Sequence, residues 1–352
     1  MRFSLLAIVT AAIATSAALC SPVEPRADAK VGYLFLHFYD NYKSPGDYST
    51  YPAGEQVFGH LSKGNDPISY TALKGGAPLL TSTVGTKGVR DFYLVSKPDE
   101  SQHYLIATDL NQTAANPPGF GGKFLSRNLV VWKSNGASLT KWSAPKLVNV
   151  VPNNFRMAWA PEAIWDDARK QFFVFWSSNK YVDSAHSGDP DSDKIYGAYT
   201  SDFTTFSAPF IYNDPGHGVI DMTLGRGPVD GKDTWVRFSK DESVSKCHGE
   251  ISQNGYLGNW TAIGAAGQYV DNVNQSEACL YFQDNNDAKW WVFLDQYGRS
   301  PPGYFPWAVN TDITQYGYTD TGHPSGMPTL LKHGTVKPLT QAQYNEVKAN
   351  WG

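Results

Sequence analysis

Four times along this chain an acidic residue stands directly before a short apolar run, and a second apolar strand follows at a nearly fixed distance. The acids are Asp91, Glu162, Asp221 and Glu277, which lie 71, 59 and 56 residues apart. The partner strands begin 13, 10, 13 and 13 residues after the acids. A repeat of this size, with several short strands per unit, is typical of units that stack around a common axis. Equivalent positions in such a ring face one place, so the pattern predicts a catalytic centre built from carboxylates.

Each repeat predicts four strands, because aromatic and β-branched runs alternate with turn residues such as Gly, Pro, Asn and Asp. Only residues 340–349 predict a short terminal helix. The expected strands cover residues 104–109, 128–133, 146–150, 172–178, 195–200, 210–212, 235–239, 250–253, 260–263, 290–295 and 307–310.

The two ends of the repeat region complement each other. Residues 32–38 resemble a second strand and residues 55–61 a third, but no first strand precedes them. Residues 333–339 supply that missing strand, with His333 where the other repeats place their acid. Pairing the ends closes a ring and removes exposed sheet edges. We therefore expect an all-β, five-bladed β-propeller closed by its N- and C-terminal strands, as a single catalytic domain over residues 31–352.

The N-terminal segment predicts export. Residues 1–20 have a positive start, an apolar stretch and small residues near their end, as a secretory signal peptide does. Residues 21–30 are polar and contain prolines, which favours a disordered lead-in or a propeptide. No other stretch is long and apolar enough to cross a bilayer, so we expect a secreted protein without a membrane partner. The net charge of −4, without a basic block, argues against a nucleic-acid partner.

An exported chain often carries disulfides and glycans. Cys247 and Cys279 fall in consecutive repeats and are candidates for a disulfide, with two buried thiols as the alternative. In a eukaryotic glycoprotein, Asn111, Asn259 and Asn274 begin glycosylation sequons. A glycan on Asn274 would crowd a cleft at Glu277, so we expect Asn274 to be unmodified if Glu277 is catalytic.

Hydrolysis of a glycosidic bond usually requires two carboxyl groups. One protonates the leaving oxygen, and the other activates water or attacks the anomeric carbon. A third carboxylate nearby can raise the pKa of the acid by repulsion between like charges. A single acid before a strand more often caps a turn at a solvated rim. Four acids in a common register favour catalysis.

Several motifs resemble glycoside hydrolase family 43. They are the repeat order, Trp159-Ala-Pro-Glu162, Ile220-Asp221, and Glu277 before an apolar strand. The resemblance covers roughly residues 32–339. It implies a five-bladed propeller that removes arabinose or xylose from plant cell-wall polysaccharide with inversion of configuration. Asp91-Phe92 and Glu277-Ala-Cys279 stand where the family often has Asp-Pro and Glu-Gly-Pro, which places the chain in a divergent branch.

The resemblance implies a role for each matched residue. Asp91 corresponds to the general base, Asp221 to the acid that tunes the pKa of its neighbour, and Glu277 to the proton donor. His333 corresponds to the axial histidine, which in the family often contacts water or a calcium ion. The resemblance implies no required cofactor and allows for a structural calcium.

Further residues are candidates for substrate binding beside His333. Trp159 could stack on a sugar ring, although packing between blades would explain it equally well. Glu162 belongs to the predicted ring of carboxylates. Arg237 interrupts an apolar strand and needs a partner, either a carboxylate of the site or a sugar hydroxyl.

The leading interpretation is a secreted, inverting, monomeric glycosidase whose partner is plant cell-wall oligo- or polysaccharide. We expect α-L-arabinofuranosidase activity first, then β-xylosidase, with an endo-acting arabinanase as a further variant. A retaining β-fructosidase would need an early Asn-Asp-Pro motif, for which residues 39–41 and 65–67 offer the only candidates. A lectin-like propeller that binds glycans without cleaving them is the alternative from another class.

Overall fold

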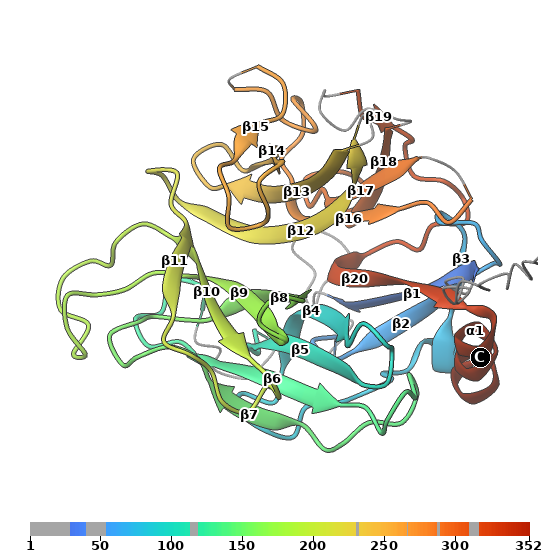
Figure 1. The fold of residues 1–352 in the computed structure, drawn as a ribbon, viewed down its shortest axis with the longest axis horizontal. Helices are drawn as coiled ribbons and strands as arrows, with labels where there is room; N and C mark the ends of the chain where they lie inside the picture. The colour runs from blue at the N-terminus through green and yellow to red at the C-terminus, as the bar shows by residue number, and fades with distance from the viewer. Residues whose placement is uncertain are drawn as a thin grey trace, which may run out of the picture.

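Five four-stranded antiparallel sheets surround a central axis in the computed structural model (Figure 1). The structure describes residues 29–39, 54–112, 119–229, 232–265, 267–286, 289–309 and 317–352. The predicted all-β, five-bladed propeller is confirmed. The predicted signal peptide over residues 1–20 and the lead-in up to residue 28 lie outside the described residues, and the first strand begins at Lys30.

The strands follow the chain from the axis outward in four of the five blades. The second blade contains β4 (Val89–Ser96), β5 (His103–Asp109), β6 (Asn128–Lys133) and β7 (Lys146–Asn149). The third contains β8 (Trp159–Asp166), β9 (Gln171–Ser178), β10 (Lys194–Thr200) and β11 (Phe210–Asn213). The fourth contains β12 (Val219–Val229), β13 (Lys232–Asp241), β14 (Lys246–Ser252) and β15 (Thr261–Ala262). The fifth contains β16 (Glu277–Gln283), β17 (Trp290–Asp295), β18 (Tyr304–Val309) and β19 (Thr319–Asp320).

The first blade joins the two ends of the chain, as expected. It contains β20 (Leu331–Thr340), β1 (Lys30–Tyr39), β2 (Phe58–Ser62) and β3 (Tyr70–Ala72), followed by the 3₁₀ turn η1 (Leu73–Gly76). β20 runs antiparallel to β1 and becomes the inner strand of this blade (Figure 1). The predicted terminal helix is α1 (Gln341–Trp351), and Thr340 caps its N-terminus. Because α1 buries Val347 and Trp351 against the first blade, it covers the point of closure.

The inner strands β4, β8, β12, β16 and β20 all contain a β-bulge at the same place. Two residues of the inner strand there oppose one residue of the neighbouring strand. The residue before the bulge (the first bulge position) is Arg90, Trp159, Ile220, Glu277 or Lys332. The next residue (the second bulge position) is Asp91, Ala160, Asp221, Ala278 or His333. Bulges of this kind re-aim side chains next to active sites.

The bulge corrects the predicted register of the four acids. Asp91, Asp221 and His333 are equivalent, but Glu277 stands one residue earlier and Glu162 two residues later than this position. The common register was therefore wrong for Glu162 and Glu277. The distance of 10 residues after Glu162, against 13 after the other acids, was a usable signal of its offset. The distance after Glu277 equals those after Asp91 and Asp221 and does not reveal its offset.

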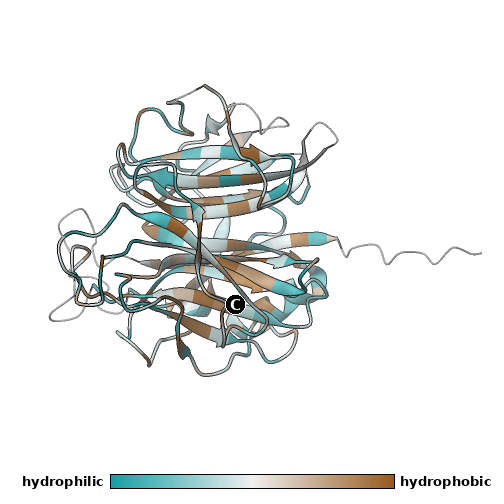
Figure 2. Cartoon of the chain, turned by 60° about the vertical axis from the view of Figure 1, so that its left-hand side comes forward, coloured by the Kyte–Doolittle hydropathy of each residue, from teal (hydrophilic) through white to brown (hydrophobic). Residues whose placement is uncertain are grey.

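Alternating faces of each strand pack into different cores between neighbouring blades. In β9, Phe172, Val174 and Trp176 face the second blade, whereas Phe173 and Phe175 face the fourth. This alternation follows from the two-residue period of a strand. Five apolar clusters fill the five blade interfaces, and apolar residues recur along the strands in Figure 2. Burial of each such side chain contributes roughly 1.5–3 kcal/mol, so the blade interfaces are the main stabilisation of the ring.

A disulfide joins Cys247 on β14 to Cys279 on β16, as the bridging alternative predicted. It connects the fourth blade to the fifth and lies two residues after Glu277. Its Cα atoms are 6.3 Å apart and it closes a segment with a sequence separation of 32. Within the described residues, no helix has the length and apolar character needed to cross a membrane.

Candidate active site

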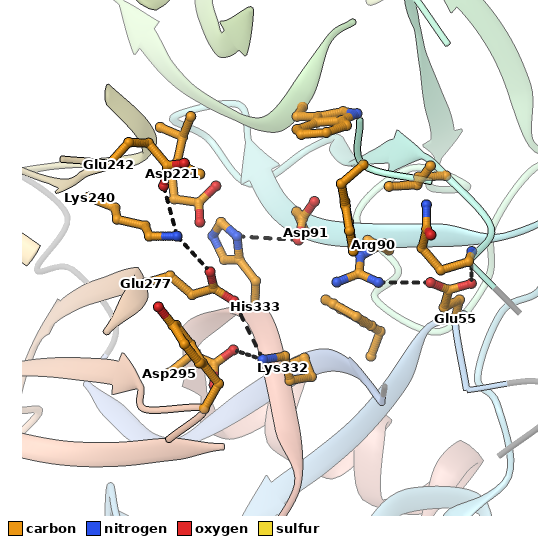
Figure 3. Close-up of a pocket in the computed structure, with 17 residues that line it drawn as sticks. Glu55, Arg90, Asp91, Asp221, Lys240, Glu242, Glu277, Asp295, Lys332 and His333 are labelled. Atoms are coloured by element: carbon orange, nitrogen blue, oxygen red, sulfur yellow. Dashed lines mark hydrogen bonds and ion pairs between the residues drawn. The ribbon is translucent and has the colours of Figure 1, made fainter. Parts of the chain in front are cut away.

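A cavity of about 680 Å³ lies where the five inner strands begin. All five residues of the first bulge position line it, as do three residues of the second. Because each inner strand contributes at the same height, residues far apart in sequence meet here (Figure 3). The ionisable residues of its wall are Glu55, Arg90, Asp91, Asp221, Lys240, Glu242, Glu277, Asp295, Tyr297, Lys332 and His333.

Each of the two carboxylate oxygens of Asp91 has one contact that holds the side chain in place. Its Oδ1 lies 3.4 Å from Nδ1 of His333, and its Oδ2 accepts a hydrogen bond of 2.8 Å from Thr108. The Thr108 hydroxyl oxygen also accepts from the backbone N–H of Ala160, which fixes its orientation. Burial alone would raise the pKa of Asp91, but His333, Arg90 and Thr108 together lower it below its ordinary value. Asp91 is therefore an oriented, ionised carboxylate.

Asp221 has the opposite electrostatic environment, although it occupies the equivalent position. Its backbone N–H donates to Ser177 Oγ at 3.0 Å, which anchors the bulge to β9 of the third blade. Burial and the charges of Glu277 and Asp91 raise the pKa of Asp221 to about 7, against the opposing effect of His333 and Lys240. Asp221 therefore holds a proton through much of the acidic range. Two carboxyl groups with separated pKa values are the usual basis of acid–base catalysis in one site.

Glu277 lies between two lysines. Lys240 Nζ is 3.0 Å from its Oε2, and Lys332 Nζ is 3.5 Å from its Oε1. Lys240 also pairs with Glu242 at 2.8 Å, and Lys332 pairs with the buried Asp295 (Figure 3). Burial opposes ionisation of Glu277, but Lys332 and Lys240 lower its pKa to about 2. Glu277 is therefore a carboxylate in this cavity.

His333 is the cation at the centre of these acids. Burial would lower its pKa, but the contact with Asp91 and the charge of Asp221 raise it to about 9. Gly334 follows, and a Cβ there would collide with the carbonyl oxygen of Leu36 on β1. Only glycine therefore allows β20 to lie this close to β1 directly after His333.

The remaining wall combines a buried ion pair with aromatic rings. Arg90 Nη1 donates to Glu55 Oε1 at 2.8 Å, and its guanidinium group lies over the rings of Phe38 and Phe120. Phe120 meets Trp159 edge to face, with centroids 6.0 Å apart. The indole Nε1 of Trp159 has no hydrogen-bond partner in the described part of the chain. Because this nitrogen is buried, Trp159 offers the cavity an apolar face rather than a donor.

Five of the seven predicted site residues meet at this cavity: Asp91, Trp159, Asp221, Glu277 and His333. Glu162 and Arg237 do not line it.

Glu162 lies two residues beyond the bulge and lines a second cavity of about 260 Å³, with residues from further along the inner strands. It is 4% exposed, and burial raises its pKa to about 8. Among the described residues its Oε2 has no hydrogen-bond partner. The offset of two residues places this carboxyl group at a different height along the axis.

Arg237 pairs elsewhere. Its Nε donates to Glu250 at 2.7 Å, Nη2 donates to Asn213 at 3.1 Å, and the guanidinium group lies 4.3 Å from the centroid of Trp260. The required partner is therefore Glu250 within the fourth blade, rather than a carboxylate of the cavity.

Sequence reasoning missed Arg90, Lys240, Asp295 and Lys332. Arg90 and Lys332 directly precede Asp91 and His333 in sequence, so their adjacency was a usable signal. Lys240 and Asp295 pair with the first bulge position of their blades, opposite Ile220 and Glu277. Those two pairings depend on the register of the bulge, which the sequence does not reveal.

A structural calcium stays a prediction. In the described ranges, no three His, Cys, Asp or Glu residues are grouped so that they could hold a metal ion. Nδ1 of His333 already faces Asp91, and two lysines occupy the surroundings of Glu277. These residues do not fit a metal at the acids of the cavity.

Of the two candidates for the Asn-Asp-Pro motif of a β-fructosidase, the structure describes the one at residues 65–67. Asn65 follows β2 and its side chain bonds Asn286 and the Lys30 carbonyl, and neither Asn65 nor Asp66 lines the cavity. Asp40 and Asn41 lie outside the described residues.

Comparison with known proteins adds the following. Residues 28–345 match a family model described as a probable glycosyl hydrolase domain, related to glycosyl hydrolase family 43. An α-L-arabinofuranosidase of Bifidobacterium longum subsp. longum is 28% identical over 204 residues, which cover 54% of this chain and 18% of that protein. The chain therefore spans only about a fifth of the length of this curated relative.

Two solved structures that match part of this chain have low sequence identity to it. The catalytic domain of a Coprinopsis cinerea GH62 α-L-arabinofuranosidase gives a TM-score of 0.49 at 11% identity, over 72% of this chain and 75% of that one. A β-fructofuranosidase from Schwanniomyces occidentalis gives 0.49 at 15% identity, over 72% and 48%.

Proposed function

Because this chain belongs to the glycosyl hydrolase 43-related family of probable glycosyl hydrolase domains, we propose that it hydrolyses glycosidic bonds of arabinose-containing plant cell-wall polysaccharide. The preferred activity is that of an α-L-arabinofuranosidase, and β-xylosidase activity is second. One observation carries the proposal: Asp91, Asp221 and Glu277 from three blades line one cavity. In that cavity the pKa of Asp221 is raised, whereas the pKa values of Asp91 and Glu277 are lowered. The named activity of the Bifidobacterium relative supports arabinose as the first sugar to test.

Asp91 acts as the general base in this proposal. A base must be ionised and oriented before the reaction, and the contacts with His333 and Thr108 provide both conditions. It would take a proton from the water that attacks the anomeric carbon. The proposed outcome is inversion, in which a water molecule stands between base and sugar.

Glu277 is the proposed proton donor, and its two lysines set a condition on that role. At mildly acidic pH the ionised Glu277 has no proton to give, whereas Asp221, whose pKa is raised to about 7, holds one. The charges of the two groups affect each other, so they act as a coupled pair. We propose that Asp221 holds the proton before reaction, that this proton passes from Asp221 to Glu277, and that Glu277 then delivers it to the leaving oxygen, which leaves both carboxyl groups ionised. Asp221 as the direct donor is the alternative assignment.

Trp159 and Phe120 are the proposed walls for the apolar faces of the sugar. The cavity of about 680 Å³ falls in the usual size range of small-ligand sites. It suits one or two sugar units, which favours removal of terminal residues.

Export of the protein is also proposed. Disulfides persist mainly in oxidising compartments, and the bridge between Cys247 and Cys279 supports such a location. The predicted signal peptide over residues 1–20 is consistent with this route.

The proposal is tested by incubating the purified protein with nitrophenyl α-L-arabinofuranoside, nitrophenyl β-xyloside and sucrose. We expect release from the arabinofuranoside, and loss of at least about 100-fold in kcat for Asp91→Asn. Lys170→Met, which removes an exposed ion pair with Asp167 away from the cavity, serves as the control. No release from any of the three substrates, with glycan binding unaffected by Glu277→Gln, would instead indicate a lectin.

A further inference from the structure

Exposed aromatic side chains are concentrated in one loop at the mouth of the cavity. Eight large apolar side chains are exposed among the described residues, and the two aromatic ones are Phe120 and Phe124. They are 53% and 67% exposed. An exposed ring loses the stabilisation that burial would give, so two in one loop suggest a binding surface.

The ring of Phe124 is held in place by a stack of rings. It lies flat on His186, with centroids 4.4 Å apart and an interplanar angle of 11°. The buried His186 in turn stacks on Tyr181 at 4.3 Å and 14°. Both ring nitrogens of His186 face backbone carbonyl oxygens, of Lys123 at 2.7 Å and of Asn153 at 3.0 Å. One face of Phe124 is therefore backed by a fixed support while the ring stays open to solvent.

The backbone of the same loop is fastened to the third blade. Arg156 donates through Nε to the carbonyl oxygen of Gly122 at 2.8 Å and through Nη2 to that of Phe120. Both rings are therefore presented by an anchored loop, which lowers the entropic cost of binding a ligand.

Phe124 belongs to the same loop as Phe120 but does not line the cavity. Phe120 lines the cavity, and Phe124 follows four residues later, so their Cα atoms are at most about 14 Å apart. A cavity that accepts one or two sugars cannot contain a polysaccharide, so the rest of the polymer must lie across the rim. The faces of pyranose rings carry C–H groups that pack on aromatic rings, as apolar groups do on the faces of aromatic side chains.

We infer that Phe124 is a sugar-stacking platform outside the cavity, which binds the polysaccharide main chain while a side-chain sugar occupies the cavity. This inference rests on the proposed function for the position of the substrate. The occupant is a neutral polymer of pyranose units that carries arabinose branches.

The test compares soluble arabinoxylan with nitrophenyl α-L-arabinofuranoside in Phe124→Ala, Phe124→Trp and Leu147→Ala. Leu147 is an exposed apolar residue on β7, the outermost strand of the same blade, and serves as the matched control. We expect Phe124→Ala to lower the ratio of kcat/KM for polymer to kcat/KM for the small substrate by roughly 3- to 10-fold. Phe124→Trp should keep the wild-type ratio, because indole also presents a flat face. An unchanged ratio in Phe124→Ala overturns the inference.

A binding measurement separates this inference from the proposed function. Migration in native gels containing arabinoxylan is followed for the same variants, without hydrolysis as the readout. Retardation that weakens in Phe124→Ala supports the platform even if the wild type releases no sugar, in which case the proposed hydrolysis alone is overturned. Retardation equal in the wild type and Phe124→Ala overturns the platform. No retardation of any variant overturns it as well.

Discussion

Nδ1 of His333 lies 3.4 Å from Oδ1 of Asp91, and this contact joins the last inner strand to the second blade. The imidazolium stabilises the ionised form of the carboxylate, and the carboxylate in turn stabilises the imidazolium. Each group shifts the pKa of the other in the direction that keeps both charged.

Replacing His333 by Gln should move the acid limb of the pH profile. His333 lowers the pKa of Asp91, so its removal raises that pKa, and Asp91 becomes protonated at a higher pH. The acid limb of kcat/KM should therefore shift to higher pH, and activity below neutral pH should fall most. His323→Gln, which lies away from the cavity against Phe305, should leave the profile unchanged. A profile of the same shape in His333→Gln contradicts the assignment of Asp91 as the base.

The proton donor can be identified from the leaving group. A good leaving group such as nitrophenolate needs little protonation, whereas a sugar alcohol needs general acid catalysis worth about 10²–10⁴ in rate. Glu277→Gln should therefore lower kcat/KM on an arabinose-substituted oligosaccharide far more than on the nitrophenyl glycoside. Asp221→Asn should lower both to a similar degree. The reverse pattern would assign the donor role to Asp221.

Lys332 should be important for stability as well as for the site. Its ammonium group pairs with Asp295 and Glu277, and Asp295 is fully buried. Lys332→Met removes the ammonium group that pairs with this buried carboxylate and should lower the free energy of unfolding by about 3–5 kcal/mol at pH 7.

Urea denaturation measures this loss. The depressed pKa of Glu277 contributes stability above its unfolded value near 4.5, and this contribution is lost as pH falls toward about 2. The effect of Lys332→Met should therefore shrink with acidification. Lys170→Met, which removes an exposed pair with Asp167, is the control and should change little. An equal effect of both variants would falsify the role of the buried pair.

The sequence patterns predicted the fold better than the site. Repeated apolar strands and complementary chain ends suffice to predict five blades, because the packing of any blade requires only alternating apolar faces. Trp159 and Glu162 show where this reasoning stops. They stand three residues apart in one motif, yet the bulge places Trp159 at the cavity and Glu162 at a different height along the axis. The cost of left-handed backbone at Asp91, Ala160, Asp221 and Ala278, on the order of 1 kcal/mol each, is offset by contacts that no local pattern reveals.

The disulfide should contribute measurably to stability. For a closed segment of this length, loss of the bridge is expected to cost about 3–4 kcal/mol, because the unfolded chain gains freedom. The double variant Cys247→Ser/Cys279→Ser should unfold at lower urea concentration, and reductant should shift the wild type in the same direction but leave the variant unaffected. Identical unfolding curves for the oxidised wild type and the double variant would contradict a stabilising bridge.

Closure of the ring by β20 sets an order of events during synthesis. A polypeptide leaves the ribosome with its N-terminus first. The strand β1 therefore cannot pair with β20 until the strands of the four other blades have been synthesised. Lys332 and His333 arrive on that last inner strand. A nascent chain therefore has no assembled cavity until residue 340 has emerged, and catalytic competence begins only with the final fold.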